Sequence, residues 1–364
     1  MIGFRNYLEL DLNFSNSKTI IIGKNAQGKS NLLEVIQILS HLKSRRAIKD
    51  AMLVNFEMTE AVIQAKANQN NEDIDISLLI RKSGRRTLKI NEVSKKPKEL
   101  AHNIFSVSFM VDDLEIINGS PSKRRDWMDS VLNQLDYSYK DDLTKFEKIL
   151  SQRNSFIKDL CERGKYYYPA LSQTEKDQLD IWDDLFIQEA NTLSSKRLEF
   201  LSKLEPLLNQ AYKDISGSDT QLRLDYLGRQ LSKEDLEECR AKDFARSYTN
   251  VGPQRDDVSF ELNENLAHNF ASQGERRTIT LAIKLSELQL LKERHGECPI
   301  LLLDDVLAEL DEDRQDFLLE AIEPDTQVII TTTHLGKHLE KWSGNAQILE
   351  IEQGRIVSNS ALVA

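Results

Sequence analysis

A phosphate-binding loop near the start of the chain constrains the fold more than any other feature. Residues 23–30 read GKNAQGKS and match the pattern GxxxxGK[ST] in full. A short β-branched run precedes the loop at residues 19–22, and an amphipathic helix pattern follows from Asn31. In this order, backbone N–H groups of the loop point at phosphate oxygens, and the helix N-terminus adds its positive dipole end. The sequence therefore predicts a nucleotide site in an α/β domain.

The loop residues predict which groups hold the nucleotide. We expect Lys29 to reach the β- and γ-phosphates and the Ser30 hydroxyl to coordinate Mg²⁺, so the expected cofactors are ATP and Mg²⁺. The nucleotide contacts predicted here are Gly23, Lys24, Asn25, Ala26, Gln27, Gly28, Lys29, Ser30 and Asn31.

An acidic motif lies far downstream, at the end of an unbroken apolar run. Residues 300–305 read ILLLDD, the Walker B arrangement. A buried strand would place Asp304 beside the phosphate loop to hold Mg²⁺. Asp305 would then polarise the attacking water as general base. The structural alternative is an acidic strand end that caps a neighbouring helix.

A Ser-x-Gly turn stands before a predicted helix over residues 275–294. Ser272, Gln273 and Gly274 would present a hydroxyl and bare N–H groups to a phosphate. Taken alone, Ser272 is better explained as a helix N-cap.

Two more segments complete the order that ABC-type ATPases share. Residues 308–311 read AELD and resemble a D-loop, with Asp311 as a nucleotide contact. His334 follows the next predicted strand and resembles the switch histidine that senses ATP. With Lys29, Asp304 and Asp305, His334 completes the predicted catalytic set.

Periodicity divides the rest of the chain. Alternating apolar residues over 74–80 and 87–90 predict an antiparallel sheet. From about residue 123 to 242 the chain is polar and mostly helical in pattern. The predicted domains are the N-terminal part of an ATPase head at 1–120, an inserted helical lobe at 121–245, and the C-terminal part of the head at 246–364.

Composition excludes several classes of protein. No apolar run approaches the ~20 residues that cross a bilayer, and the start lacks the apolar core of a signal peptide. We therefore expect a cytoplasmic protein without a membrane partner. The cysteines Cys161, Cys239 and Cys298 are widely separated and predict reduced thiols rather than a disulfide or zinc framework.

The net charge of −11 argues against a general nucleic-acid binder, but basic residues cluster locally. Phosphate attraction acts within about a Debye length, so a basic surface on an acidic protein can still bind DNA. Each cluster fits a solvated charged face equally well. The candidate DNA contacts are Lys43, Arg45, Arg46, Arg81, Arg85 and Arg86.

Six segments together resemble the RecF family of ABC-type ATPases, over nearly the whole chain. They are FRNY at 4–7, GKNAQGKSNLLE at 23–34, GSPSKRR at 119–125, GPQRDD at 252–257, FASQGE at 270–275 and LLDDVLAELD at 302–311. The resemblance implies an SMC-like ATPase head: a mixed sheet with flanking helices, an antiparallel β subdomain and an inserted helical lobe in place of a long coiled coil. In the Q-loop region, Asp112 and Asp113 depart from the family's usual pattern.

The resemblance also implies an activity in recombinational repair. It implies an ATP-driven homodimer, in which Ser272 and Gly274 of one protomer contact the γ-phosphate bound by the other. That dimer would bind duplex DNA at single-strand gaps and, with RecO and RecR, promote recombinase loading, and weak, DNA-stimulated ATP hydrolysis would drive release. Asp305 is one methylene shorter than the glutamate of transporter ATPases, which predicts slow turnover.

Three alternatives remain at this point. A transporter ATPase shares the site but lacks a long helical insert. A defence-type ATPase coupled to a nuclease would need an acidic catalytic cluster, and none follows His334. A structural protein with a degenerate site would not need the intact motif residues Lys29, Ser30, Asp304 and Asp305.

Overall fold

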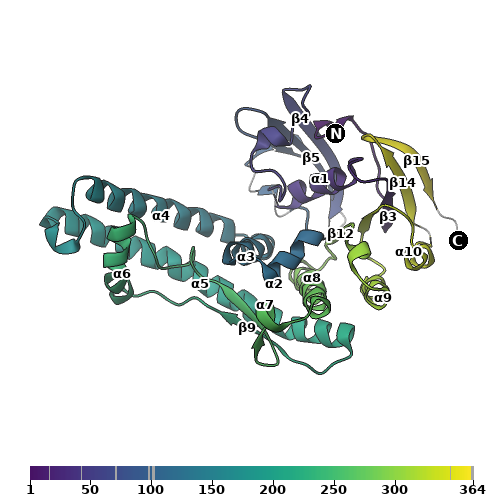
Figure 1. Cartoon of the computed structure of the whole chain (residues 1–364). Coiled ribbons are helices and arrows are strands. Elements are labelled where there is room, and N and C mark those ends of the chain that lie inside the picture. The colour runs from purple at the N-terminus through teal and green to yellow at the C-terminus, as the bar shows by residue number, and fades with distance from the viewer. Residues whose placement is uncertain are drawn as a thin grey trace. The chain divides into compact units, whose positions relative to one another are not determined.

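The computed structural model describes residues 1–15, 17–41, 43–69, 72–96, 99–100, 103–344 and 346–361 (Figure 1). Contacts divide the chain into two compact units. Unit 1 comprises Met1–Leu114, Gln210–Ser218 and Arg277–Ala364, and unit 2 comprises Glu115–Asn209 and Asp219–Arg276.

A mixed six-stranded sheet forms the centre of unit 1, in the order β15-β14-β3-β13-β12-β8. All neighbours pair in parallel except β14 and β15, which form an antiparallel hairpin at one edge. The carboxyl ends of parallel strands meet at one edge of a sheet, where ligands bind in such folds. The strands are β3 (Lys18–Ile22), β8 (Ser106–Met110), β12 (Ile300–Asp304), β13 (Val328–Thr332), β14 (Gln347–Glu352) and β15 (Arg355–Ala361).

Helices and short 3-10 turns complete this part of unit 1. Helix α1 (Lys29–His41) buries Leu32, Leu33 and Ile36 in a cluster with residues of the central strands. The others are α8 (Gln273–His295), which begins in unit 2, α9 (Glu312–Ala321), α10 (Lys337–Trp342), η1 (Asp50–Met52), η3 (Val111–Leu114) and η5 (Val306–Glu309).

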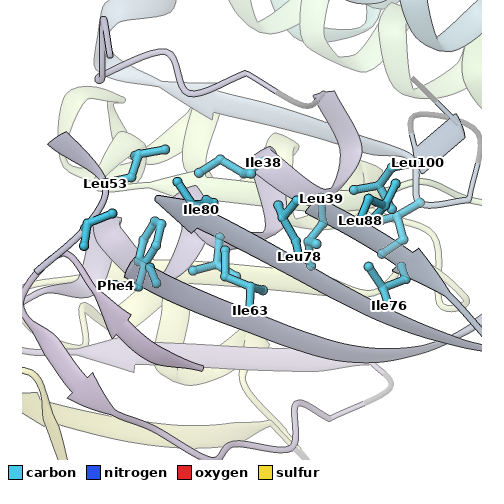
Figure 2. Packing of buried hydrophobic residues seen from close by; sticks show 14 of the residues in the cluster. Phe4, Ile38, Leu39, Leu53, Ile63, Ile76, Leu78, Ile80, Leu88 and Leu100 are labelled. Atoms are coloured by element: carbon cyan, nitrogen blue, oxygen red, sulfur yellow. The ribbon is translucent and has the colours of Figure 1, made fainter. Parts of the chain in front are cut away.

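The predicted antiparallel sheet is confirmed, with the order β2-β1-β4-β5-β6-β7. Figure 2 shows Ile76, Leu78 and Ile80 of β5 in one apolar cluster with Ile38 and Leu39 of α1. This alternation of buried side chains is the period-2 pattern that the sequence displays. The strands are β1 (Ile2–Phe4), β2 (Tyr7–Glu9), β4 (Glu60–Gln69), β5 (Glu72–Arg81), β6 (Thr87–Ile90) and β7 (Val93–Lys95).

Unit 2 is mainly helical, and Figure 1 shows α4 lying along α5. A buried ion-pair cluster joins three helices: Arg153 of α4 bonds Asp183 of α5 at 2.8 Å and Asp243 of α6 at 2.9 Å. The helices are α2 (Glu115–Asn118), α3 (Pro121–Leu135), α4 (Tyr139–Glu162), η4 (Tyr168–Ala170), α5 (Gln173–Ser216), α6 (Lys233–Arg246) and α7 (Ala267–Phe270).

A three-stranded sheet in unit 2 differs from the sequence prediction. Within the stretch expected to be helical, β9 (Leu222–Tyr226) forms and pairs antiparallel with β10 (Val258–Leu262), whose other neighbour is β11 (Asn265–Leu266). Because its partner lies in unit 2, β10 joins that unit and not the ATPase head. The units therefore divide at 114/115 and 276/277, with 210–218 in unit 1, whereas we predicted boundaries at 120/121 and 245/246.

Among the described residues, no helix has the length and apolar character needed to cross a membrane.

Candidate nucleotide site

The phosphate loop joins β3 to α1 at the carboxyl edge of the central sheet. Its two glycines stand where a larger side chain would clash. Gly28 has φ +113°, and a Cβ there would approach the Asn6 side chain to 2.6 Å. At Gly23 a Cβ would come within 2.5 Å of the Ile351 carbonyl oxygen. Both positions therefore require glycine. Ala26 adopts the left-handed conformation with φ +65°, which helps turn the loop.

Two residues of the N-terminal hairpin brace the loop from behind. The buried Tyr7 hydroxyl donates to the Gly28 carbonyl at 3.0 Å, and Asn6 Nδ2 donates to the Gln27 carbonyl at 3.1 Å. Burial raises the pKa of Tyr7 well above its usual value, so the hydroxyl stays a donor. In the sequence the segment FRNY stands out only by resemblance; these bonds give two of its residues a role.

The β14–β15 turn braces the same loop. Gly354 N–H donates to the Gln27 carbonyl at 3.0 Å, and Gln353 N–H donates to Gln27 Oε1 at 2.6 Å. The local sequence does not predict this contact, because more than three hundred residues separate Gln27 from Gln353.

Lys29 is buried at the mouth of the loop, with a side chain 3% exposed. Its Nζ donates to the carbonyls of Gly23 at 2.7 Å and Lys24 at 3.3 Å, and it lies 3.8 Å from Asp305 Oδ2. The cation is thus held by the loop itself and faces the acid that directly follows β12, two strands away from β3 in the sheet.

The structure brings Ser30 and Asp304 together, as the sequence predicted. The Ser30 hydroxyl donates to Asp304 Oδ1 at 2.8 Å. Thr331, which sequence reasoning missed, donates to the same oxygen at 2.7 Å. Thr331 stands opposite Asp304 in the β12–β13 register, so only the strand pairing reveals it.

Asp305 is held by its backbone N–H, and its carboxylate faces the Lys29 ammonium. Its N–H donates to Thr331 Oγ1 at 3.0 Å, and its φ of +53° turns the chain out of β12. Burial raises the pKa of the Asp305 carboxyl; nearby Lys29 opposes this shift and Asp304 adds to it. A carboxyl with a raised pKa is a stronger base than an ordinary aspartate once ionised.

The donor set at this edge suits Mg²⁺. Ser30 and Asp304 offer a hydroxyl and a carboxylate, hard oxygen donors of the kind that Mg²⁺ takes together with phosphate oxygens and waters. No cluster of three or more His, Cys, Asp or Glu side chains that could hold a metal occurs among the described residues. A Mg²⁺ site of this kind needs only one or two protein ligands, so the residues fit it.

Arg5 of the N-terminal hairpin and Glu34 of α1 form a partly buried ion pair. Arg5 Nε and Nη2 donate to the two Glu34 oxygens at 2.8 and 2.7 Å, and the Glu34 side chain is fully buried. Ser44 donates to the same carboxylate at 2.5 Å. The pair fixes the N-terminal hairpin to the helix that follows the phosphate loop.

The signature residues lie in unit 2, where Ser272 caps α8. Its hydroxyl and N–H bond Glu275 Oε2 at 2.7 and 2.8 Å, and Glu275 N–H returns a bond to the hydroxyl at 3.2 Å. This reciprocal arrangement is a capping box, and the bonds from Ser272 lower the pKa of Glu275. The predicted phosphate contacts of Ser272, Gln273 and Gly274 stay predictions.

The D-loop aspartate and the candidate switch histidine also have local roles. Asp311 caps α9, accepting the Arg314 N–H at 3.0 Å. His334 is exposed after β13, and its Nδ1 lies 3.0 Å from Thr333 Oγ1. Their contacts with nucleotide stay predictions.

Comparison with known proteins shows the family of the chain. The chain matches the RecF/RecN/SMC N terminal domain over residues 1–356. It is 39% identical, over 97% of each chain, to the DNA replication and repair protein RecF of Rippkaea orientalis. It has the same identity and coverage with the protein of that name from Microcystis aeruginosa. The chain belongs to the RecF family.

Solved structures place the RecF-family fold among SMC-type heads. A structure described as the recombination mediator protein RecF-ATP in the RecFOR pathway has a TM-score of 0.87 and 31% identity. The match covers 99% of this chain and 95% of the solved RecF chain. A Smc head bound to the winged-helix domain of ScpA has a TM-score of 0.55 at 15% identity. That match covers 100% of this chain and 95% of the Smc head chain. The predicted ATPase-head fold with a helical insert is confirmed.

Two RecF-family motifs of unit 2 bind each other. Arg124 of the segment GSPSKRR makes a bidentate pair with Asp257 of GPQRDD, at 2.6 and 2.8 Å. Arg125 donates to the Asp256 carbonyl at 2.8 Å. These motifs therefore stabilise unit 2, and the arginines are not free for a ligand.

Three candidate DNA contacts are already paired in the structure. Arg45 bonds the buried Asp113 at 2.8 Å, and Arg86 bonds Asp50 at 2.6 Å. Arg81 lies 3.6 Å from Glu60. Asp113, in the Q-loop region, also pairs with the buried Lys284 at 3.1 Å, so it serves a buried charge cluster.

The other three candidates are Lys43, Arg46 and Arg85, and all are exposed. Arg85 stands in the turn between β5 and β6, where Gly84 has the φ of +109° that a tight turn requires. The antiparallel pairing that the alternating residues at 74–80 and 87–90 predict is confirmed. No ion pair forms at Arg46 or Arg85 with any described residue, and both cations face solvent.

Proposed function

We propose that this chain is an ATP-dependent DNA-binding protein of recombinational repair with a slow ATPase activity. The single observation that carries the proposal is the convergence of Lys29, Ser30, Asp304 and Asp305 at the carboxyl edge of one sheet, within the distances given above. The relatives described as RecF and RecF-ATP support ATP as the nucleotide.

The residues would divide the work of ATP binding and hydrolysis. The N–H groups of residues 23–31 and the Lys29 ammonium would hold the phosphates, and Ser30 with Asp304 would hold Mg²⁺, which neutralises phosphate charge. Thr331 keeps Asp304 oriented. Asp305 would accept a proton from the attacking water, and His334 would sense the γ-phosphate.

Hydrolysis would be slow and DNA-stimulated. The Asp305 side chain is short and faces Lys29 at 3.8 Å, so in this arrangement it is directed to the loop. We propose that Ser272, Gln273, Gly274 and Asp311 complete the site across an ATP-driven homodimer, with the capped helix end of α8 facing the partner's γ-phosphate.

The DNA ligand would be duplex DNA next to a single-strand gap, with RecO and RecR as partner proteins and the cytoplasm as location. The solved relative described as a recombination mediator in the RecFOR pathway supports this assignment. Acids already pair with Arg45, Arg81 and Arg86, so we propose the exposed Lys43, Arg46 and Arg85 as the principal phosphate contacts.

The test is fluorescence anisotropy of gapped duplex DNA, titrated with the chain in ATP and in ADP at two salt concentrations. We expect much tighter binding in ATP, lost in Lys29→Ala and in Ser272→Arg. The matched control is Lys203→Ala, whose side chain lies on the exposed surface of α5 and pairs with Glu199. Equal binding in both nucleotides would refute ATP-dependent DNA binding by the homodimer and favour a defence-type or transport-type ATPase.

A further inference from the structure

One exposed aromatic ring of unit 1 is not explained by the nucleotide site or by the fold. The side chain of Phe56, between η1 and β4, is 97% exposed. Among the described residues, no ring or cation–π contact involves it. Placing a whole phenyl ring in water forgoes about 2 kcal/mol of burial free energy, so such a ring calls for a reason.

The ring is presented on a fixed backbone. Asn55, which is 8% exposed, accepts the Met58 N–H at 3.1 Å and closes a tight turn. Its side chain accepts the Glu57 N–H at 3.0 Å and donates to the Arg5 carbonyl at 2.7 Å. The turn therefore holds Phe56 outward from a rigid base.

The turn of the β5–β6 hairpin lies against the same loop. Lys82 Nζ donates to the Phe56 carbonyl at 2.9 Å, and Arg86 binds Asp50. Below them, Leu53 and Ile80 belong to the apolar cluster of Figure 2, so both segments rest on one core. We call residues 43–58 and 81–86 together the hairpin face.

The charge of the hairpin face is opposite to that of the whole chain. It carries eight lysines and arginines against two acids, Asp50 and Glu57, whereas the chain has a net charge of −11. Arg46, Lys49 and Arg85 are exposed. Protein–protein interface cores are depleted in charge, whereas single-stranded nucleic acid is bound by cations that follow the backbone and aromatic rings that stack on bases.

We propose that Phe56 stacks on a base face that DNA exposes where a single strand meets the duplex. The cations of the hairpin face would hold the phosphates on either side, and the fixed ring would replace the missing neighbouring base. A continuous duplex offers no open base face, so the ring would confer preference for the junction. The inference rests on the proposed DNA-binding function and names the feature of DNA that this surface recognises.

The experiment uses the full chain with ATP and three DNA probes: a continuous duplex, the same duplex with a single-strand gap, and the gapped duplex with 2-aminopurine as the last paired base. Phe56→Ala should weaken binding to the gapped duplex about tenfold, because stacking contributes ~1–3 kcal/mol per base. Binding to the continuous duplex should stay unchanged, and the 2-aminopurine signal should no longer respond to the protein. Phe56→Trp, which keeps an aromatic ring, should behave like the unmodified chain on all three probes.

The matched control is Tyr167→Ala, which removes another exposed ring, 61% exposed, from the segment between α4 and α5. It should leave every probe unaffected. Wild-type affinity for the gapped duplex in Phe56→Ala would overturn the inference and leave the ring as a protein-docking site, with the ATP-dependent DNA binding intact. An equal loss on both duplexes would overturn the junction assignment. Failure of the unmodified chain to bind any probe would overturn both this inference and the proposed function.

Discussion

The Thr331 hydroxyl donates to Asp304 Oδ1 at 2.7 Å and accepts the Asp305 N–H at 3.0 Å. One side chain on β13 therefore orients both acids at the end of β12. Valine has nearly the same shape, so Thr331→Val removes these two bonds and little else. We expect about 1–3 kcal/mol lower unfolding free energy, since buried polar groups lose their partner. We also expect about tenfold slower ATP turnover, equivalent to ~1.4 kcal/mol in the barrier.

Steady-state ATPase assays and urea unfolding measure both effects. The matched control is Thr326→Val: this threonine is 2% exposed, and its hydroxyl has no hydrogen-bond partner among the described residues. The control should keep turnover unchanged and raise stability by about 1 kcal/mol, because an unsatisfied buried hydroxyl is removed. Unchanged turnover in Thr331→Val would contradict the orienting role.

A second prediction concerns the stability that the ion pair of Arg5 and Glu34 contributes. Glu34→Leu leaves a partly buried guanidinium without its partner and should cost about 3–5 kcal/mol of unfolding free energy. The double variant Arg5→Met with Glu34→Leu removes both charges and should cost less than Glu34→Leu alone. Urea denaturation of the four proteins of the cycle tests this, and additive losses would rule out coupling between the two side chains.

Neighbouring arginines of the hairpin turn should behave differently on DNA. Arg85 is exposed, so Arg85→Ala should lower the slope of log affinity against log salt by about 0.9 for each phosphate that the variant no longer neutralises. Arg86 is bonded to Asp50, so Arg86→Ala should change the slope little and lower stability by at most about 1 kcal/mol. Anisotropy titrations over a salt series compare them. The assignment fails if Arg86→Ala changes the slope more than Arg85→Ala.

His338 predicts a pH dependence of stability. Its Nδ1 lies 2.5 Å from Asp316 and its Nε2 3.7 Å from Glu312, and the bond to Asp316 raises the pKa of His338 above its ordinary value of 6.5. The stabilisation that protonated His338 contributes to folding is therefore complete below pH 6.5. It is lost as the pH rises through the pKa of His338 in the folded state. Thermal melts of the wild type and His338→Gln should differ most at about pH 6 and converge in alkaline buffer. A gap that stays constant with pH would exclude the ion pair as its cause.

Local chemistry made much of the nucleotide site predictable. The loop at 23–30 and the strand ending at Asp304 are recognisable from their own residues. The glycine spacing of the one and the unbroken apolar run of the other are patterns of a few consecutive residues. Thr331 carried none, since its contact with Asp304 depends on strand pairing, and Tyr7 stood out only by family resemblance, since its bond to Gly28 joins residues far apart in sequence. Likewise β9 was missed, because so short a strand is recognised only beside its partner β10.

Whether a charged side chain is paired or open to solvent was the least predictable property. Arg45 and Arg86 looked like open cations in sequence, yet Asp113 and Asp50 neutralise them from 68 and 36 residues away. Phe56 shows the opposite: an apolar residue in a loop is expected to be covered, and the turn at Asn55 exposes it instead. Sequence reports which groups exist, and long-range folding decides which remain free.

The brace between Gln27 and the β14–β15 turn has a consequence during protein synthesis. The phosphate loop is made first, but β3 pairs with β13 and β14, and Gln27 bonds Gln353 and Gly354. A ribosome must therefore finish nearly all the residues described here before β13, β14 and the β14–β15 turn can brace the loop. Truncated nascent chains would carry the complete motif and still lack a formed site, so an unfinished copy could not compete for nucleotide.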